Sequence, residues 1–239
     1  MQGLLTLQFE KCLSLFSERV LPVPNLEHGI LVSEGFALCS IFDLFKVDVI
    51  LESGVCNGKS TLMLRRYFGK TVIIKAVDIK GISSSVQLSL GDIVDFKRGD
   101  SEHLFPKYIK RWSNKRIGVF IDGPKREAGV KLAKSCFAAP NVVVVGVHDM
   151  HRKEINQHEV DRGKKYNNTR RIFDKIKTSK FLTDEDWYVK KTYILDKIVK
   201  NRHTKYWTPY GYKNCDAKTR GNFGSYGFTI GFLMKVDML

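Results

Sequence analysis

The chain has 239 residues, of which 43% are hydrophobic, and a formal net charge of +15. This size and apolar content suit one large domain with a sizeable core, and we expect residues 1–239 to form a single domain. No apolar run approaches the roughly 20 residues of a membrane span, and residues 1–20 lack the pattern of a signal peptide.

Five cysteines are scattered along the chain without any C-x-x-C pair. This argues against a thiolate zinc site and favours a reducing compartment, so we expect a cytoplasmic protein. Basic residues are densest after Arg152, especially over residues 164–205. Such a surface attracts nucleic acid, phosphorylated sugars or other anions, although a merely soluble basic surface explains it equally well.

Apolar residues recur with a helical period over residues 2–19, which predicts the first helix of an N-terminal helical extension over residues 1–30. The prolines at 22 and 24 end that helix. Ser33 is then expected to cap a second helix that runs from about Glu34 to Phe45 and leads into the first strand.

A strand, a glycine turn, a helix and a second strand follow within about 30 residues. The apolar run 49–51 ends in Glu52, and a helical segment over 59–68 leads to the apolar run 72–77, which is closed by Asp78. This order predicts the nucleotide-binding half of a doubly wound α/β fold, in which ligands bind at the carboxyl ends of the strands.

The turn itself limits the choice of ligand. Gly54 and Gly58 allow a sharp turn and a close approach of the backbone to a ligand, but three residues separate them. That spacing fits neither the dinucleotide pattern nor the P-loop pattern, which would use Lys59. S-adenosylmethionine, which carries no phosphate, suits the turn better, with a P-loop-like site as the alternative. A carboxylate at Asp78 suits the ribose hydroxyls of an adenosine.

Three further strands are expected along the chain. Residues 83–90 are interpreted as a short helix, and residues 93–98 as a third strand that ends before Asp100 and Ser101. This polar pair can reach an adenine edge, cap the helix that runs to residue 112, or do both. A fourth strand over 117–122 leads into a helix over 126–137.

A fifth strand over residues 142–147 ends in the run His148-Asp149-Met150-His151. Its continuous valines are typical of strands that are buried on both faces. Beyond it we expect a basic helix over 168–180, a strand over 187–195, an insertion over 196–225 near the acceptor site and a final strand over 226–234. The aromatic run around Tyr210 is either an acceptor wall or a loop packed under the sheet.

The chain resembles the class I S-adenosylmethionine-dependent methyltransferases over most of residues 30–236. The resemblance rests on the motif of residues 52–58, on Asp78, on residues 99–101 and on residues 120–123. It is nearest to the rhamnosyl O-methyltransferase and cephalosporin hydroxylase group. It implies a Rossmann-like, doubly wound, mostly parallel seven-stranded sheet with helices on both faces. The implied contacts to S-adenosylmethionine are Glu52, Ser53, Gly54, Asn57, Gly58, Ser60, Asp78, Ile79, Asp100 and Ser101.

The resemblance also implies methyl transfer to a hydroxyl of a sugar, a glycan or a similar small molecule. A hydroxyl is a poor nucleophile, so it needs a base, a metal or both. Asp122 and Asp149 are the first candidates for catalysis, and His148 or His151 for the base. Related enzymes often hold a divalent metal such as Mg²⁺, for which Asp122, His148 and Asp149 are the candidate ligands.

Two positions depart from that pattern. His148 stands where an acid is expected, and Lys125 stands where a histidine often follows. Lys125 and Tyr210 are candidate substrate contacts, although Lys125 suits a solvated helix start equally well.

Two other functions stay open at this stage. The charge and the interleaved aromatic residues also fit an RNA ribose 2′-O-methyltransferase, in which Asp122 would be the aspartate of a Lys-Asp-Lys-Glu set. A non-catalytic nucleotide-binding module with the same fold is the third possibility.

Overall fold

The structure is a computed structural model that describes residues 1–21, 30–84, 86, 94–151, 169–192 and 228–239. It contains a seven-stranded sheet in the order β3-β2-β1-β4-β5-β7-β6. The predicted α/β fold with a mostly parallel seven-stranded sheet is therefore confirmed. The strands are β1 (Val49–Ser53), β2 (Ile73–Asp78), β3 (Asp95–Arg98), β4 (Ile117–Ile121), β5 (Val142–His151), β6 (Ser179–Leu182) and β7 (Phe228–Met234).

Strands β1 to β5 run parallel, and β7 lies antiparallel between β5 and β6. The chain order reverses between β1 and β4, because β2 and β3 extend the sheet on one side and β5 on the other. Such a switch point leaves a crevice at the carboxyl ends of the strands. All the motifs singled out in the sequence lie at that edge.

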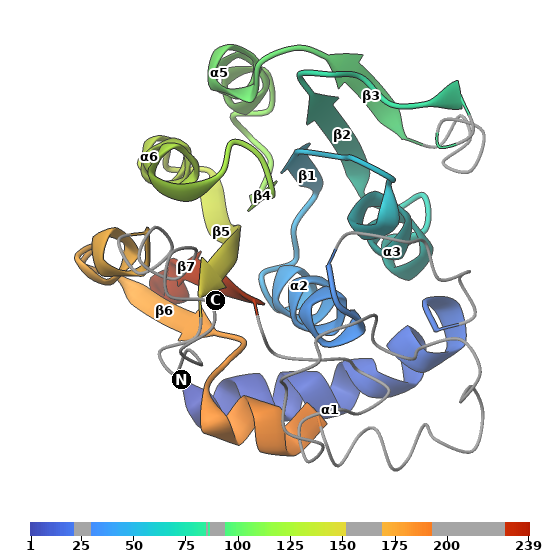
Figure 1. Ribbon diagram of the computed structural model, residues 1–239. Helices are drawn as coiled ribbons and strands as arrows, with labels where there is room; N and C mark the ends of the chain where they lie inside the picture. The colour runs from blue at the N-terminus through green and yellow to red at the C-terminus, as the bar shows by residue number, and fades with distance from the viewer. Residues whose placement is uncertain (22–29, 85, 87–93, 152–168, 193–227) are drawn as a thin grey trace, which may run out of the picture.

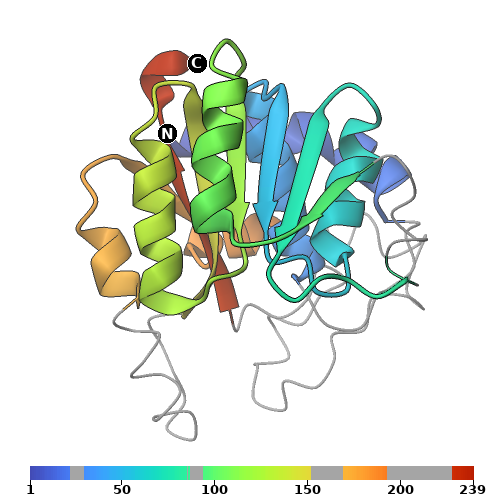
Figure 2. The ribbon, with the colours of Figure 1, turned by 90° about the horizontal axis from the view of Figure 1, so that it is seen from above.

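Helices cover both faces of the sheet (Figure 1, Figure 2). One face carries α1 (Gln2–Arg19), α2 (Val32–Leu44) and α3 (Lys59–Phe68), and the other carries α5 (Ser101–Arg111) and α6 (Arg126–Phe137). A short 3₁₀ helix, η4 (Val236–Met238), follows the last strand. Among the described residues, no helix is both long and apolar enough to cross a membrane.

The predicted helix over residues 2–19 is confirmed as α1. Its buried residues Leu5, Phe9, Cys12 and Phe16 recur every three to four positions, which gives the helix one apolar face. Phe9 and Phe16 lie 5.6 Å and 5.1 Å from the ring of Phe36 on α2, between ring centroids. The helix therefore docks on α2 through aromatic contacts.

The predicted cap of α2 is wrong. The helix begins at Val32, and Ser33 is fully buried inside its first turn. The carboxylate of Glu34 instead accepts a hydrogen bond of 2.6 Å from the backbone N–H of Leu31. An acidic side chain in the first turn satisfies a free N–H as a serine would, so the helix starts without Ser33.

The predicted elements after residue 168 are also wrong in part. Helical structure covers residues 169–174, and the end of the predicted helix is instead strand β6 (Ser179–Leu182), an edge strand paired with β7. Residues 186–192 form a helix, where a strand over 187–195 was predicted. Tyr188 and Thr192 are buried four positions apart, and Glu185 accepts a hydrogen bond from the N–H of Leu182 at the start of this helix. The aromatic composition favoured a strand, but burial follows a helical period.

Several predicted segments lie outside the described residues. They are most of the helix over 83–90, the insertion over 196–225 with Tyr210, and the two ends of the basic stretch over 164–205.

Candidate functional site

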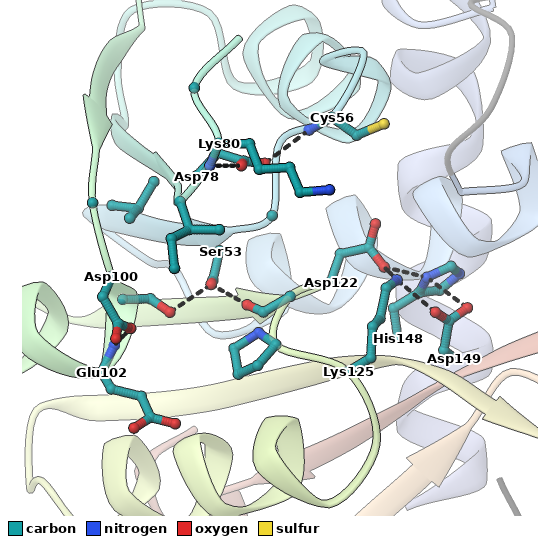
Figure 3. Close-up of a pocket in the computed structure, with 18 residues that line it drawn as sticks. Ser53, Cys56, Asp78, Lys80, Asp100, Glu102, Asp122, Lys125, His148 and Asp149 are labelled. Atoms are coloured by element: carbon teal, nitrogen blue, oxygen red, sulfur yellow. Dashed lines mark hydrogen bonds and ion pairs between the residues drawn. The ribbon is translucent and has the colours of Figure 1, made fainter. Parts of the chain in front are cut away.

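A cavity of about 770 Å³ opens at the carboxyl ends of the strands (Figure 3). Its size is that of a small-molecule site. Its wall is made of the carboxyl-terminal parts of β1, β2 and β5 and of the turns that follow β1, β2, β3 and β4, which is where the sequence placed the site. The lining residues are Ser53, Gly54, Cys56, Val77, Asp78, Ile79, Lys80, Gly81, Gly99, Asp100, Ser101, Glu102, Asp122, Gly123, Pro124, Lys125, His148 and Asp149.

The glycine turn lies tightly against the end of β4. Gly54 has φ +87°, and a Cβ at this position would lie 2.6 Å from the backbone nitrogen of Gly123 and 2.8 Å from the carbonyl carbon of Asp122. The backbone carbonyl of Ser53 accepts hydrogen bonds of 2.7 Å and 3.0 Å from the N–H groups of Asp122 and Gly123. No other residue type fits at position 54 without moving the β4 turn.

Asp78 holds the glycine turn from the neighbouring strand. Its Oδ2 accepts hydrogen bonds from the N–H groups of Val55 (2.9 Å) and Cys56 (3.2 Å), and its Oδ1 accepts one from Lys80 (2.9 Å). Three N–H groups thus fix the carboxylate at the rim of the cavity, and a carboxylate has about four acceptor positions. Asp78 positions the turn and retains one acceptor position for a ligand hydroxyl.

The adenine side predicted from the sequence lies at the β3 end of the cavity. Asp100 caps α5, since its Oδ1 accepts a hydrogen bond of 2.9 Å from the N–H of Glu102. The hydroxyl of Ser101 shares a hydrogen bond of 2.7 Å with that of Ser53. Ile79 lines the cavity with 66% of its surface exposed, an apolar surface suited to a flat aromatic ring.

Four of the predicted cofactor contacts are not among the residues that line the cavity: Glu52, Asn57, Gly58 and Ser60. Glu52 is fully buried and accepts a hydrogen bond from the Ser60 hydroxyl through Oε1, while Oε2 has no hydrogen-bond partner within the described part of the chain. Burial raises the pKa of Glu52 to about 7, and the Ser60 hydrogen bond opposes this shift. Glu52 supports the turn from below.

A charged cluster forms the opposite end of the cavity. Asp122 follows β4, Lys125 precedes α6, and His148 and Asp149 lie near the end of β5 (Figure 3). Lys125 Nζ bonds to Asp122 Oδ1 and lies 2.5 Å from Asp149 Oδ2. His148 Nδ1 lies 2.6 Å from Asp122 Oδ1 and 3.3 Å from Asp149 Oδ1. The sequence had named these four residues, and the structure brings them together.

A strand irregularity allows two consecutive residues to enter this cluster. The pairing of β5 with β7 shifts register between Val147 and Met150, and Asp149 has φ +61°. Side chains of successive residues in a regular strand point to opposite faces. The irregularity changes that direction, so that both His148 and Asp149 line the cavity.

Glu34, which was not predicted from the sequence as a site residue, joins the cluster from α2. It is 1% exposed, and its carboxylate lies 3.3 Å from His148 Nε2. Burial lowers the pKa of His148, but Glu34 and Asp122 outweigh it and raise the pKa well above its usual value. Burial opposes the ionisation of Asp122, but His148 and Lys125 lower its pKa overall. The cluster is therefore a set of paired ions.

The structure does not favour the P-loop alternative. Lys59 is the first residue of α3 and does not line the cavity. Burial lowers the pKa of its ammonium, and Glu34 opposes that shift. A lysine that binds phosphate has to reach the ligand, and Lys59 is not among the residues that line the cavity.

Two of the predicted site residues lack a described side chain. His151 is the last residue of β5, but its side chain lies outside the described part of the structure, as does Tyr210 altogether. Besides Glu34, the sequence analysis missed Lys80 and Glu102, which line the cavity. Lys80 lies two positions after the strand-end acid and Glu102 is in the first turn of α5, so position just after a strand end was the available signal. The roles of all predicted site residues stay predictions.

No protein-family profile matches the chain, and no curated protein matches it. Solved structures do. The O-methyltransferase TomG from Streptomyces achromogenes, involved in tomaymycin synthesis and solved with S-adenosylmethionine, matches with a TM-score of 0.50 and 14% identity over 95% of this chain and 89% of that one. The chain has the class I methyltransferase fold. Cofactor-bound Rv0187 from MTB also matches the chain, with a TM-score of 0.50 and 12% identity over 95% of this chain and 89% of that one.

Proposed function

We propose that the protein is an S-adenosylmethionine-dependent O-methyltransferase. The observation that carries the proposal is one cavity with two unlike ends. The first end offers Asp78, Ile79 and the glycine turn, and the second offers the charged cluster around Asp122 and Lys125. An adenosine fits the first end by its hydroxyls and flat base, and an acceptor hydroxyl fits the second.

The cofactor is supported by the fold and by the turn. TomG, a protein of the same fold, was solved with S-adenosylmethionine. In this chain, the wall of the cavity closes tightly at Gly54, and Lys59, the lysine that follows the turn, does not line the cavity. A cofactor without phosphate suits such a turn better than ATP.

The second end suits a neutral hydroxylated acceptor. Its two carboxylates accept hydrogen bonds, and its ammonium and imidazolium donate them. This mixture fits a polyol better than an apolar ring, so a sugar or a similar small molecule is the acceptor that we propose. The carboxylates orient the hydroxyl, and positioning in line with the methyl group supplies much of the rate enhancement.

A titration with S-adenosylhomocysteine by calorimetry tests the cofactor, with ATP as the control ligand. We expect binding of the homocysteine and none of ATP. Transfer of a labelled methyl group from S-adenosylmethionine to sugars, catechols and RNA then tests the acceptor. Labelling of sugars supports the proposal, whereas labelling confined to RNA or catechols contradicts the acceptor class. Absence of homocysteine binding contradicts the function.

A further inference from the structure

The charged end of the cavity contains the residues that a divalent metal would use. Asp122, His148 and Asp149 each offer a ligand atom, and these atoms lie within 4.8 Å of one another. Two carboxylates and an imidazole at such a spacing can hold a divalent ion. Whether they fit one here depends on what already occupies their ligand atoms.

The two carboxylates are already bridged by Lys125. Its ammonium bonds to Asp122 Oδ1 and lies 2.5 Å from Asp149 Oδ2. A magnesium ion would lie about 2.1 Å from an oxygen of each carboxylate. The ammonium and the ion would therefore occupy nearly the same place, and both are positive.

His148 offers no lone pair in this arrangement. Its Nδ1 lies 2.6 Å from Asp122 Oδ1, and its Nε2 lies 3.3 Å from the carboxylate of Glu34. A carboxylate only accepts hydrogen bonds, so each ring nitrogen that faces one donates a proton to it. A metal ligand has to be an imidazole nitrogen without a proton. The residues therefore do not fit a resident metal.

We propose that Lys125 is a built-in cation that takes the place of a divalent metal in this site and holds Asp122 and Asp149 together beside the acceptor. The catalytic meaning of this inference rests on the proposed function. The ion pairs themselves do not depend on it. We therefore expect a metal site to form when Lys125 is replaced, because removal of the ammonium leaves two neighbouring carboxylates that attract a cation.

The test measures binding of Mn²⁺ alone, by calorimetry and by electron paramagnetic resonance, to the wild type and to Lys125→Met. We expect weak binding by the wild type and an increase in affinity of at least about tenfold in the variant, since a positive charge at the ion's position is lost. Lys80→Met is the matched control, because Lys80 lines the same cavity without an ion pair to either carboxylate among the described contacts. It should bind Mn²⁺ like the wild type.

Two further variants keep the test decisive. Lys125→Gln replaces Lys125→Met if the latter does not fold by circular dichroism, and Lys125→Met/Asp149→Asn should lose the gained affinity. The inference is overturned if Lys125→Met, or Lys125→Gln in its place, binds Mn²⁺ with the same affinity as the wild type. S-adenosylhomocysteine binding is measured on the same samples. Its loss in every sample, with the Mn²⁺ gain intact, contradicts the proposed function but leaves the built-in cation standing.

Discussion

Replacement of Glu52 by glutamine should change the pH dependence of stability. Glu52 lies beneath the glycine turn with no exposed surface, and burial raises its pKa to about 7. Between pH 4.5, the ordinary pKa of a glutamate side chain, and about pH 7, the folded protein keeps the proton while the unfolded chain loses it. The folded state then binds more protons than the unfolded state, so stability falls as pH rises through this window.

The size of the change in the free energy of unfolding follows from the pKa shift of Glu52. A pKa that moves from 4.5 to about 7 corresponds to about 3 kcal/mol, at about 1.4 kcal/mol for each unit. The buried carboxylate of Glu52 lowers the free energy of unfolding by this full amount above pH 7 and not at all below about pH 4.5. Glu52→Gln keeps the shape of the side chain and an oxygen that accepts the Ser60 hydrogen bond. The variant should be near the wild type at pH 5 and more stable by up to about 3 kcal/mol at pH 8.

Urea unfolding of both proteins at pH 5, 6, 7 and 8 measures this difference. His148 also changes stability with pH, but it is present in both proteins, so the difference between them isolates Glu52. Glu102→Gln, an exposed carboxyl group on the same cavity, is the control. A difference between Glu52→Gln and the wild type that stays constant from pH 5 to pH 8 would refute the reasoning.

Three further variants test the site. Gly54→Ala should lower the free energy of unfolding by about 1–3 kcal/mol in urea titrations, because its Cβ meets the β4 turn at 2.6 Å; stability equal to the wild type would contradict this. Asp78→Ala should weaken S-adenosylhomocysteine binding at least about tenfold in calorimetry, while Asp95→Ala, outside the cavity, should not. Asp149→Asn should lower turnover about 100-fold or more and spare homocysteine affinity; unchanged turnover would remove Asp149 from the mechanism.

Local patterns in the sequence predicted the core of the fold. The apolar runs of β1, β4 and β5 are buried on both faces, as continuous runs of valine, isoleucine and leucine require. Each run ends in a polar residue, so the edge of the sheet that carries the cavity followed from the sequence alone. The strand and the helix within residues 179–192 could not be predicted in this way, because aromatic residues such as Trp187 and Tyr188 fit a buried helix as well as a strand.

The pairing within the site could not be predicted in the same way. Glu34 has the sequence position of an ordinary first-turn acid, and only the packing of α2 against the sheet brings its carboxylate to His148. Lys125 has the sequence position of a solvated helix start, and it bridges two carboxylates because a separate strand end supplies the second. Sequence spacing carries no information on such contacts between elements.

Several of the deviations from regular backbone lie at the cavity, although Lys46 and Arg126 also have positive φ and do not line it. Gly54, Cys56 and Asp149 all have positive φ, and all three line the cavity. For Cys56 and Asp149 this conformation is costly, of order 1–3 kcal/mol each, so the surrounding structure has to hold it. Asp78 holds Cys56 through its N–H group, and Lys125 holds the carboxylate of Asp149. Asp78 and Lys125, the charged side chains at the two ends of the cavity, therefore also hold its backbone. Substitution of either residue is expected to change the shape and the charge of the cavity together.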